Sequence, residues 1–390
     1  MDFFKRALEL NEDTIENRRY LHRNAEVGME LPKTKTYLMQ KLRAYGIEAK
    51  TCGHGIVGII GKEKKGKVIL LKADMDALPM EEKSGLPFAC QTKTEAHTCG
   101  HDMNSAMLLT AARMLKEKEE ELTGTVKIMF EPAEECFQGG KDMIAAGVLE
   151  HPKVDVALSF HIGAGGSPGG YFFNKEGATM ASCDGFRIKI TGAGAHGAYP
   201  HQEKDPINIA MRIYGALQEV VAMECDPTET CTLTIGHMEA GTVFNIIPDT
   251  AVMEGSIRTM SREMRKLLVT RMKEVVRLTA EMFHAEAEVE MLSEVPPLIC
   301  DPKLTDEMQK YLSQSTAAPY SVQGIQASAS DDFAEITERV PGVYMFLAGG
   351  FADREAGVSH SPEVQFNEET LPFGAGAFAH CAAEWLKNNR

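Results

Sequence analysis

Side chains of the kinds that bind divalent metals follow several apolar runs of the sequence, at the points where strands would end. In open α/β sheets, ligands bind outside the carboxyl ends of the strands. We therefore expect these side chains to lie close together. They are Asp74 and Asp76 after the run 68–71, Glu134 and Glu135 after 126–130, His161 after 154–160, His360 beyond 343–348, and Cys99 and His101 before a helix at 105–118.

The neighbouring residues Glu134 and Glu135 suit metal-dependent hydrolysis for a physical reason. Adjacent side chains diverge, so one glutamate can bind a cation while the other reaches the water bound to it and works as general base and acid. Thiolate, imidazole and carboxylate together fit zinc, or manganese where oxygen and nitrogen dominate. The candidate ligands outnumber the four of a closed tetrahedral site, so the sequence indicates two ions that share a bridging ligand.

Each of these residues also has a simpler explanation when it is taken alone. All of the simpler explanations must hold together for the site to vanish, so the metal site is the favoured interpretation. The alternatives are a buried thiol at Cys99, a helix-capping imidazole at His101, a first helical turn favoured by the dipole at Glu134-Glu135, a loop histidine at His161, and turn formers at Asp74 and Asp76.

Two kinds of secondary-structure pattern succeed one another along the chain. Helical spacing over residues 11–45 is followed by alternating strand-like and helical segments, with several strands apolar throughout, as in a buried, largely parallel sheet. From about Cys183 the pattern becomes two long helices among alternating strands. The sequence therefore predicts an α/β catalytic domain, with helices on both faces of its sheet, over 1–183 and 297–390. An α+β domain at 184–296 interrupts it.

Composition narrows the class of protein. The chain has 390 residues, 44% of them hydrophobic and 25% charged, with a net charge of −15. Such an acidic chain is not expected to bind nucleic acid or anionic membranes. No apolar run reaches the roughly 18 residues of a membrane span, and the start lacks a signal-peptide pattern. Nine irregularly spaced cysteines fit reduced thiols, so we expect a cytoplasmic protein.

Several of these segments together resemble the M20 family of metallopeptidases and amidohydrolases. The resemblance is greatest to the branch of hippurate hydrolases, N-acyl-amino-acid amidohydrolases and hydrolases of indole-acetic-acid conjugates, and it runs in order from about Asn17 to the C-terminus. It is carried by Leu-Lys-Ala-Asp74-Met-Asp76-Ala-Leu-Pro, His97-Thr-Cys99-Gly-His101-Asp102, Glu131-Pro-Ala-Glu134-Glu135, Ser-Phe-His161, Phe-Asn245-Ile-Ile-Pro-Asp249, Gly-Ser-Ile-Arg258-Thr and His360-Ser-Pro.

The resemblance implies a role for each residue of the site. Cys99 would bridge two divalent ions, zinc or manganese, with cobalt or nickel as further candidates. Glu134 would be the general base, and Asp76 would act beside it without binding metal. Asp74 stands where other branches have a ligating histidine. The remaining metal ligands would be His101, Glu135, His161 and His360.

The interrupting domain resembles the lid and dimerisation domain of that family. His196 would then stabilise the oxyanion in the partner subunit's site, and Asn245 and Arg258 would hold the substrate's carboxylate, since an arginine binds a carboxylate with two hydrogen bonds. We therefore expect a homodimer or a larger assembly. Alternatively, His196 only structures its glycine-rich turn.

The expected reaction is hydrolysis of the amide bond of an N-acyl-amino acid to a carboxylic acid and a free amino acid. A dipeptidase or carboxypeptidase of the same fold is the alternative, with a dipeptide as substrate. The segment 192–197 matches G-x-G-x-x-G, but a loop rather than a helix follows it, which disfavours a dinucleotide-binding oxidoreductase. A non-catalytic metal-binding protein is disfavoured because Glu134 is present.

Three segments depart from the family's usual pattern. Met103-Asn104-Ser105 replaces Gly-His-Thr after Gly-His-Asp, and Ser330-Asp331-Asp332-Phe333 replaces Ser-Glu-Asp-Phe. The usual proline-containing loop after His161 is replaced by Ile-Gly-Ala-Gly-Gly-Ser. None of these changes removes a proposed ligand, but they leave the acyl group open.

Overall fold

The computed structural model describes residues 2–62, 64–315 and 320–389, which divide into two units. The first unit comprises Met1–Thr179, Ile299–Gln326 and Asp331–Arg390, and the second comprises Met180–Leu298 and Ala327–Ser330. The segment expected at 184–296 lies within the second unit, which also takes in a short return segment before Asp331. The strands β7 (Ala178–Met180) and β14 (Leu298–Ile299) pair with each other.

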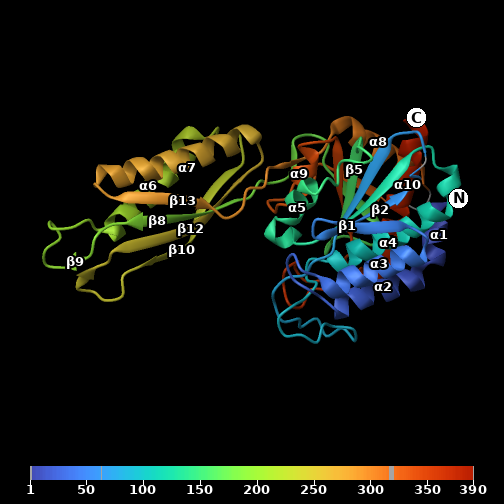
Figure 1. Ribbon diagram of the computed structural model, residues 1–390, viewed down its shortest axis with the longest axis horizontal. Helices are drawn as coiled ribbons and strands as arrows, with labels where there is room; N and C mark the ends of the chain where they lie inside the picture. The colour runs from blue at the N-terminus through green and yellow to red at the C-terminus, as the bar shows by residue number, and fades with distance from the viewer. Residues whose placement is uncertain (1, 63, 316–319, 390) are drawn as a thin grey trace. The chain divides into compact units, whose positions relative to one another are not determined.

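A mixed sheet forms the centre of the first unit, with the strand order β1-β2-β4-β3-β5-β16-β6-β15 (Figure 1). Its middle is parallel, because β3 pairs in parallel with β4 and β5, and β5 with β16. The expected α/β class with a largely parallel sheet is therefore confirmed. The strands are β1 (Glu48–Cys52), β2 (Gly55–Ile60), β3 (Val68–Asp74), β4 (Thr125–Glu131), β5 (Val156–Gly163), β6 (Gly170–Phe173), β15 (Tyr320–Gln323) and β16 (Gly342–Ala348).

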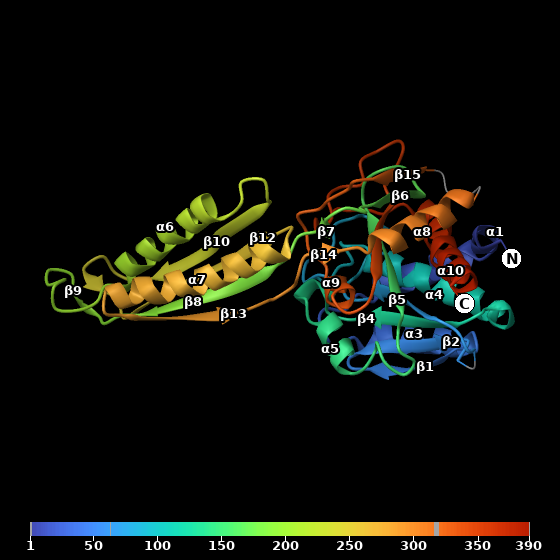
Figure 2. The same cartoon turned by 90° about the horizontal axis from the view of Figure 1, so that it is seen from above.

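Strands β3 and β4 are buried along their whole length because structure covers both faces of the sheet. Ile69 and Leu71 lie in the core cluster with side chains of α4 and α10. Successive side chains of a strand point to opposite faces, so Lys72 faces the other side and meets residues just before α9. Figure 2 shows the helices around this sheet. They are α1 (Phe3–Glu9), α2 (Asn11–Arg23), α3 (Pro32–Ala44), α4 (His101–Glu117), α5 (Gly139–Ala145), α8 (Pro302–Gln314), α9 (Phe333–Thr337) and α10 (Leu371–Asn388).

The second unit is an antiparallel sheet with the order β10-β12-β8-β13, and α6 and α7 pack against it (Figure 2). Alternate residues of β8 are buried, as expected for a sheet covered on one face. Helix α6 begins at Pro206, and Asp205 caps it by accepting a hydrogen bond from the Ile207 N–H. The elements are β8 (Asp184–Thr191), β9 (Ala195–His196), α6 (Pro206–Glu224), β10 (Cys231–Ala240), β11 (Ile246–Ile247), β12 (Thr250–Thr259), α7 (Arg262–Met282) and β13 (Glu286–Met291).

Within the part of the chain that the structure describes, none of the helices is both long and apolar enough to span a membrane. The nine cysteines are free thiols.

Candidate metal centre

The structure brings the expected metal ligands together at the carboxyl edge of the first unit's sheet. Single ligand atoms from Cys99, His101 and His161 lie within 4.8 Å of one another, and so do those from Cys99, Glu135 and His360. A third group joins His101 to Glu134 and Glu135. Cys99, His101 and Glu135 each belong to two of these three groups, so the groups adjoin one another and Cys99 is near candidate ligands of both groups that it joins.

Backbone hydrogen bonds orient the two buried imidazoles. The Nδ1 atom of His101 lies 2.9 Å from the Asp76 carbonyl oxygen, and that of His161 lies 2.7 Å from the Ile162 carbonyl oxygen. A carbonyl only accepts hydrogen bonds, so Nδ1 carries a proton in both rings, and Nε2 is the atom turned toward the other candidate ligands. His101 Nε2 is buried without a hydrogen-bond partner, and His161 Nε2 lies 3.6 Å from Cys99 Sγ. Both rings are thus oriented so that Nε2 is the atom that would bind a metal ion.

Gly100 sets the approach of the helix that carries His101. Its φ angle is +92°, and an added Cβ would lie 2.2 Å from Ile162 Cγ2 on strand β5. The first turn of α4 is also tied to the strands: Ser105 Oγ donates to the Asp74 carbonyl, and Asn104 Oδ1 accepts from the Ile162 N–H. Helix α4 begins at His101, one turn earlier than the expected start at 105, so this ligand is part of the helix.

A strained turn presents the two glutamates. Glu134 and Glu135 lie in a short 3₁₀ helix between Ala133 and Phe137, whose φ angles are +53° and +55°. Non-glycine residues adopt such angles at an energetic cost and often do so at functional sites. The Asp76 carboxylate accepts hydrogen bonds from the N–H groups of Glu134 at 3.2 Å and Glu135 at 3.3 Å. Asp76 therefore holds this turn and, through its carbonyl, His101.

The last candidate ligand, His360, comes from an exposed loop. The side chain of His360 is 51% exposed, and its Nε2 lies 3.5 Å from Glu135 Oε1. Its φ angle is +67°, and its N–H donates to the Thr98 carbonyl at 2.9 Å. This bond joins the loop of His360 to the segment that carries Cys99.

The donor set fits divalent metal ions. In the protein chain alone, burial raises the pKa of Cys99 to about 12 and lowers the pKa of His161 to about 4. A bound dication reverses the first effect, because a coordinating thiol is deprotonated outright, and a neutral imidazole is the form that binds metal. Together with the orphaned Nε2 of His101, these groups form a site that a cation completes.

A buried ion pair anchors the start of α4. Arg18 Nε donates to Asp102 Oδ2 at 2.7 Å, and these side chains are 1% and 0% exposed. His22 Nδ1 contacts the same oxygen at 2.8 Å, and its Nε2 reaches Glu82 Oε1 at 2.9 Å. Burial would raise the pKa of Asp102, but Arg18 and His22 outweigh it and hold that pKa well below its usual range.

Sequence reasoning missed a second buried charge cluster beside Glu134. Lys72 contacts Asp74, Asp331 and other carboxylates, and Asp331 and Asp332 form a group with Glu134 whose carboxylate oxygens lie within 4.8 Å. A signal for this cluster was Lys72, which directly follows the apolar run 68–71 and precedes Asp74. Asp74 pairs with Lys72 and belongs to none of the ligand groups found among the described residues.

The three candidate residues of the second unit lie at two separate places. His196 is opposite Ile246 in the β9–β11 pair, and the Gly197 N–H donates to the Asn245 carbonyl, so His196 and Asn245 are neighbours. Arg258 lies at the other end of β12, where it donates to Ser330 Oγ at 2.9 Å. The eight residue-to-residue steps from Thr250 to Arg258 span roughly 27 Å at the usual strand rise. One chain therefore does not place His196 beside its own Arg258.

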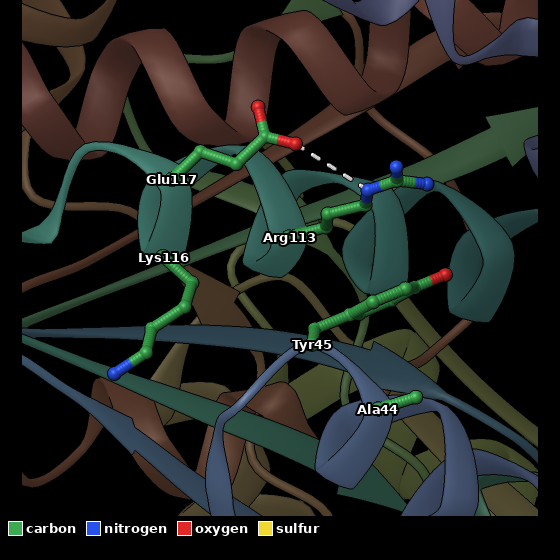
Figure 3. Close-up of a pocket in the computed structure, with 5 residues that line it drawn as sticks. All are labelled: Ala44, Tyr45, Arg113, Lys116 and Glu117. Carbon is green, nitrogen blue, oxygen red and sulfur yellow. Dashed lines mark ion pairs between the residues drawn. The ribbon is translucent and has the colours of Figure 1, made fainter.

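A hollow on the surface of the first unit lies between other elements, at the end of α3 and on α4 (Figure 3). Arg113 pairs with Glu117 at 3.4 Å and lies over the Tyr45 ring, and Lys116 pairs with Glu119. None of the expected site residues lines this hollow, so it does not change the assignment of the candidate metal site to the sheet edge.

Comparison with known proteins agrees with this geometry. Residues 70–384 match the family described as peptidase family M20/M25/M40. The chain belongs to this family. The M20 resemblance noted in the sequence is thereby confirmed, and this M20 chain is an enzyme that hydrolyses amide bonds.

Three relatives illustrate the range of M20 proteins to which the chain is similar. Thermostable carboxypeptidase 2 of Saccharolobus solfataricus is 34% identical over 387 residues, which cover 97% of this chain and 96% of that protein. Hippurate hydrolase of Campylobacter jejuni is 32% identical over 396 residues, which cover 99% of this chain and 100% of that protein. The structure of the Bacillus subtilis YXEP protein, described as a dinuclear metal-binding peptidase, matches with a TM-score of 0.81 and 29% identity over 97% of this chain and 99% of its own.

Proposed function

We propose that this protein is a metal-dependent hydrolase of N-acyl-amino acids, cleaving the amide bond to release a carboxylic acid and a free amino acid. One observation carries the proposal. Two groups of candidate metal ligands share Cys99, and the carboxylate of Glu134 adjoins two of those ligands, His101 and Glu135. The hippurate hydrolase relative supports the substrate class.

Two divalent ions would be held by Cys99 as the bridge and by His101, Glu135, His161 and His360. When bound, such ions polarise the substrate carbonyl and lower the pKa of a water molecule. Zinc or manganese suits this mixture of sulfur, nitrogen and oxygen donors, with cobalt or nickel as further candidates.

Glu134 would carry the proton. Its Oε2 lies 3.8 Å from His101 Nε2, so the carboxylate adjoins the ligands. Burial, and then the neighbouring carboxylates of Asp331 and Asp74, raise the pKa of Glu134 well above its usual range. A carboxylate in such surroundings can accept a proton from water and return it to the leaving amine. Asp76 would hold Glu134 in position, because its carboxylate accepts a hydrogen bond from the Glu134 N–H.

The second unit would complete the site across a homodimer. His196 and Asn245 lie at one end of β12 and Arg258 at the other, so a site that uses all three needs two chains. Each chain would place its Arg258 at its own site and lend His196 to its partner. In this arrangement Arg258 and Asn245 bind the substrate's carboxylate, and His196 donates to the developing oxyanion.

A carboxypeptidase or dipeptidase is the second candidate, because the Saccharolobus relative is a carboxypeptidase. Both reactions cleave an amide next to an amino acid with a free carboxylate, so the same residues would serve either one.

The free cysteines also fit a reducing compartment such as the cytoplasm.

The experiment is a product-release assay on N-acetyl, N-benzoyl and N-indolylacetyl amino acids and on dipeptides, run with zinc, manganese and cobalt in turn. We expect at least one N-acyl-amino acid to have a higher kcat/KM than every dipeptide, and its amide without the free carboxylate to be a poor substrate. Faster cleavage of dipeptides would favour the second candidate, and no hydrolysis with any metal would contradict both.

A further inference from the structure

Lys72 is a charged residue in the middle of the hydrophobic core. It lies on β3 and is 0% exposed, and a lone ammonium group is costly to bury. Its Nζ contacts the Asp74 carboxylate, lies 3.2 Å from Asp331 Oδ1 and 3.6 Å from Glu131 Oε2, and is 3.9 Å from Asp332 Oδ1. A single ammonium thus faces four carboxylates.

The four carboxylates are not equivalent. Burial would raise the pKa of Asp331, but Lys72 outweighs it and lowers that pKa, so Asp331 is ionised. Burial instead raises the pKa of Asp332 to about 7 and that of Glu131 well above its usual range. Lys72 itself keeps its proton, because Asp331 and Asp74 outweigh the effect of burial on its pKa.

Asp331 is also fixed in space. The oxygen that faces Lys72 accepts a hydrogen bond from the Phe333 N–H at 2.7 Å, at the start of α9. The Asp331 carboxylate adjoins that of Glu134, with ligand atoms within 4.8 Å. An immobile anion at this distance repels Glu134 whenever Glu134 is ionised, as a general base must be before it accepts a proton. It therefore disfavours rotamers of the ionised Glu134 that turn away from the metal ligands.

We propose that Lys72 and Asp331 form a buried ion pair that holds Glu134 facing the metal ligands, and that both are positioning residues of the hydrolytic site. The inference rests on the proposed function, because it takes Glu134 as the group that carries the proton. It also gives a role to Ser330-Asp331-Asp332-Phe333, which departs from the family's usual sequence.

Asp331→Asn is the most informative variant, because it removes one charge, keeps the shape, and leaves Lys72 paired with Asp74. We expect kcat to fall by about 10–100-fold, the usual effect of losing such a supporting contact, while KM and the metal content stay as in the wild type. Asp331→Glu, which keeps the charge, should recover most of the lost kcat. The matched control is Asp155→Asn at the opposite end of β3, where Asp155 accepts from the Val68 N–H, and it should leave kcat unchanged.

A crystal structure of metal-loaded Asp331→Asn provides the readout that does not depend on activity. We expect Glu134 to leave its wild-type rotamer or to occupy more than one. The inference is overturned if kcat stays within twofold of the wild type, or if Glu134 keeps a single wild-type rotamer. If the wild type hydrolyses none of the substrates tested, the proposed function fails, and the rotamer of Glu134 alone decides the positioning role.

Discussion

The two units hold their candidate functional residues in opposite ways. In the first unit, Cys99, His101 and His161 are largely buried, and hydrogen bonds fix the two imidazoles before any ligand arrives. In the second unit, His196 and Asn245 are exposed, at and beside the short β9–β11 strand pair. In the first unit the fold itself positions the candidate residues. In the second unit they would need contact with another surface to be positioned in a site.

Apolar side chains surround the exposed pair. Phe244 is fully exposed, and Val243 and Ile246 are about half exposed on the same segment. Exposed aromatic and aliphatic groups that cluster on one segment are typical of an interaction surface. This is what a second copy of the chain would cover in the proposed dimer.

The largest effect on activity should come from replacing Glu134 in the first unit. Glu134→Gln removes the proton carrier but no proposed ligand, so we expect activity to fall by about 10²–10⁴-fold with both metals retained. Steady-state kinetics and elemental analysis check this. Glu176→Gln, at an exposed position of the first unit, is the control. Glu134→Gln activity within a few fold of the wild type would show that Glu134 does not carry the proton.

The buried scaffold of the first unit should be nearly as sensitive. Arg18→Met leaves the Asp102 carboxylate buried without its main partner, which should cost about 3–5 kcal/mol of unfolding free energy. Arg6→Met, which breaks the more exposed pairs with Glu9 and Glu117, should cost at most about 1 kcal/mol. Urea unfolding of the two variants measures the difference. Equal losses would mean that burial of the Arg18 pair has no special importance.

Loss of the proposed oxyanion donor should have a somewhat smaller effect. His196→Ala should lower kcat by about 10²–10³-fold without loss of metal. Mixing it with Glu134→Gln under subunit exchange should restore activity, since each heterodimer holds one site with both residues intact. If exchange is confirmed and activity does not return, His196 does not act across a dimer.

The smallest effect should appear at the proposed interface. Phe244→Ser should weaken dimerisation by about 10–100-fold, because burying such a side chain is worth about 1.5–3 kcal/mol. Leu8→Ser, at an exposed position of α1 in the first unit, should leave it unchanged. Sedimentation velocity over a range of concentrations measures both variants. An unchanged dimer in Phe244→Ser would move the interface elsewhere.

The sequence predicted the sheet, and it predicted which candidate ligands gather at the sheet's edge, because both follow local rules. Buried parallel strands are apolar throughout, and the residues after them gather at one edge, so Glu135 and His161 could be named together. Contacts between distant segments could not be predicted. Lys72 and Asp331 are 259 positions apart, and a lysine in a strand usually points to solvent.

Backbone geometry was equally hidden. The left-handed angles of Ala133, Phe137 and His360 occur at residues other than glycine, where no sequence pattern announces them. Similarly, the separation of His196 from Arg258 depends on strand registers, which pair Thr232 with Arg258 in the four-stranded sheet and Ile246 with His196 in the separate β9–β11 pair.

The measurement that most directly tests a prebuilt two-metal site is the metal content of the reconstituted protein. Apo-protein loaded with excess zinc or manganese, desalted and analysed by inductively coupled plasma mass spectrometry, should hold two ions per chain. Cys99→Ser should lose metal, because an alcohol replaces a bridging thiolate poorly. One ion or none in the wild type, or two tightly bound ions in Cys99→Ser, would contradict the dinuclear site with a cysteine bridge.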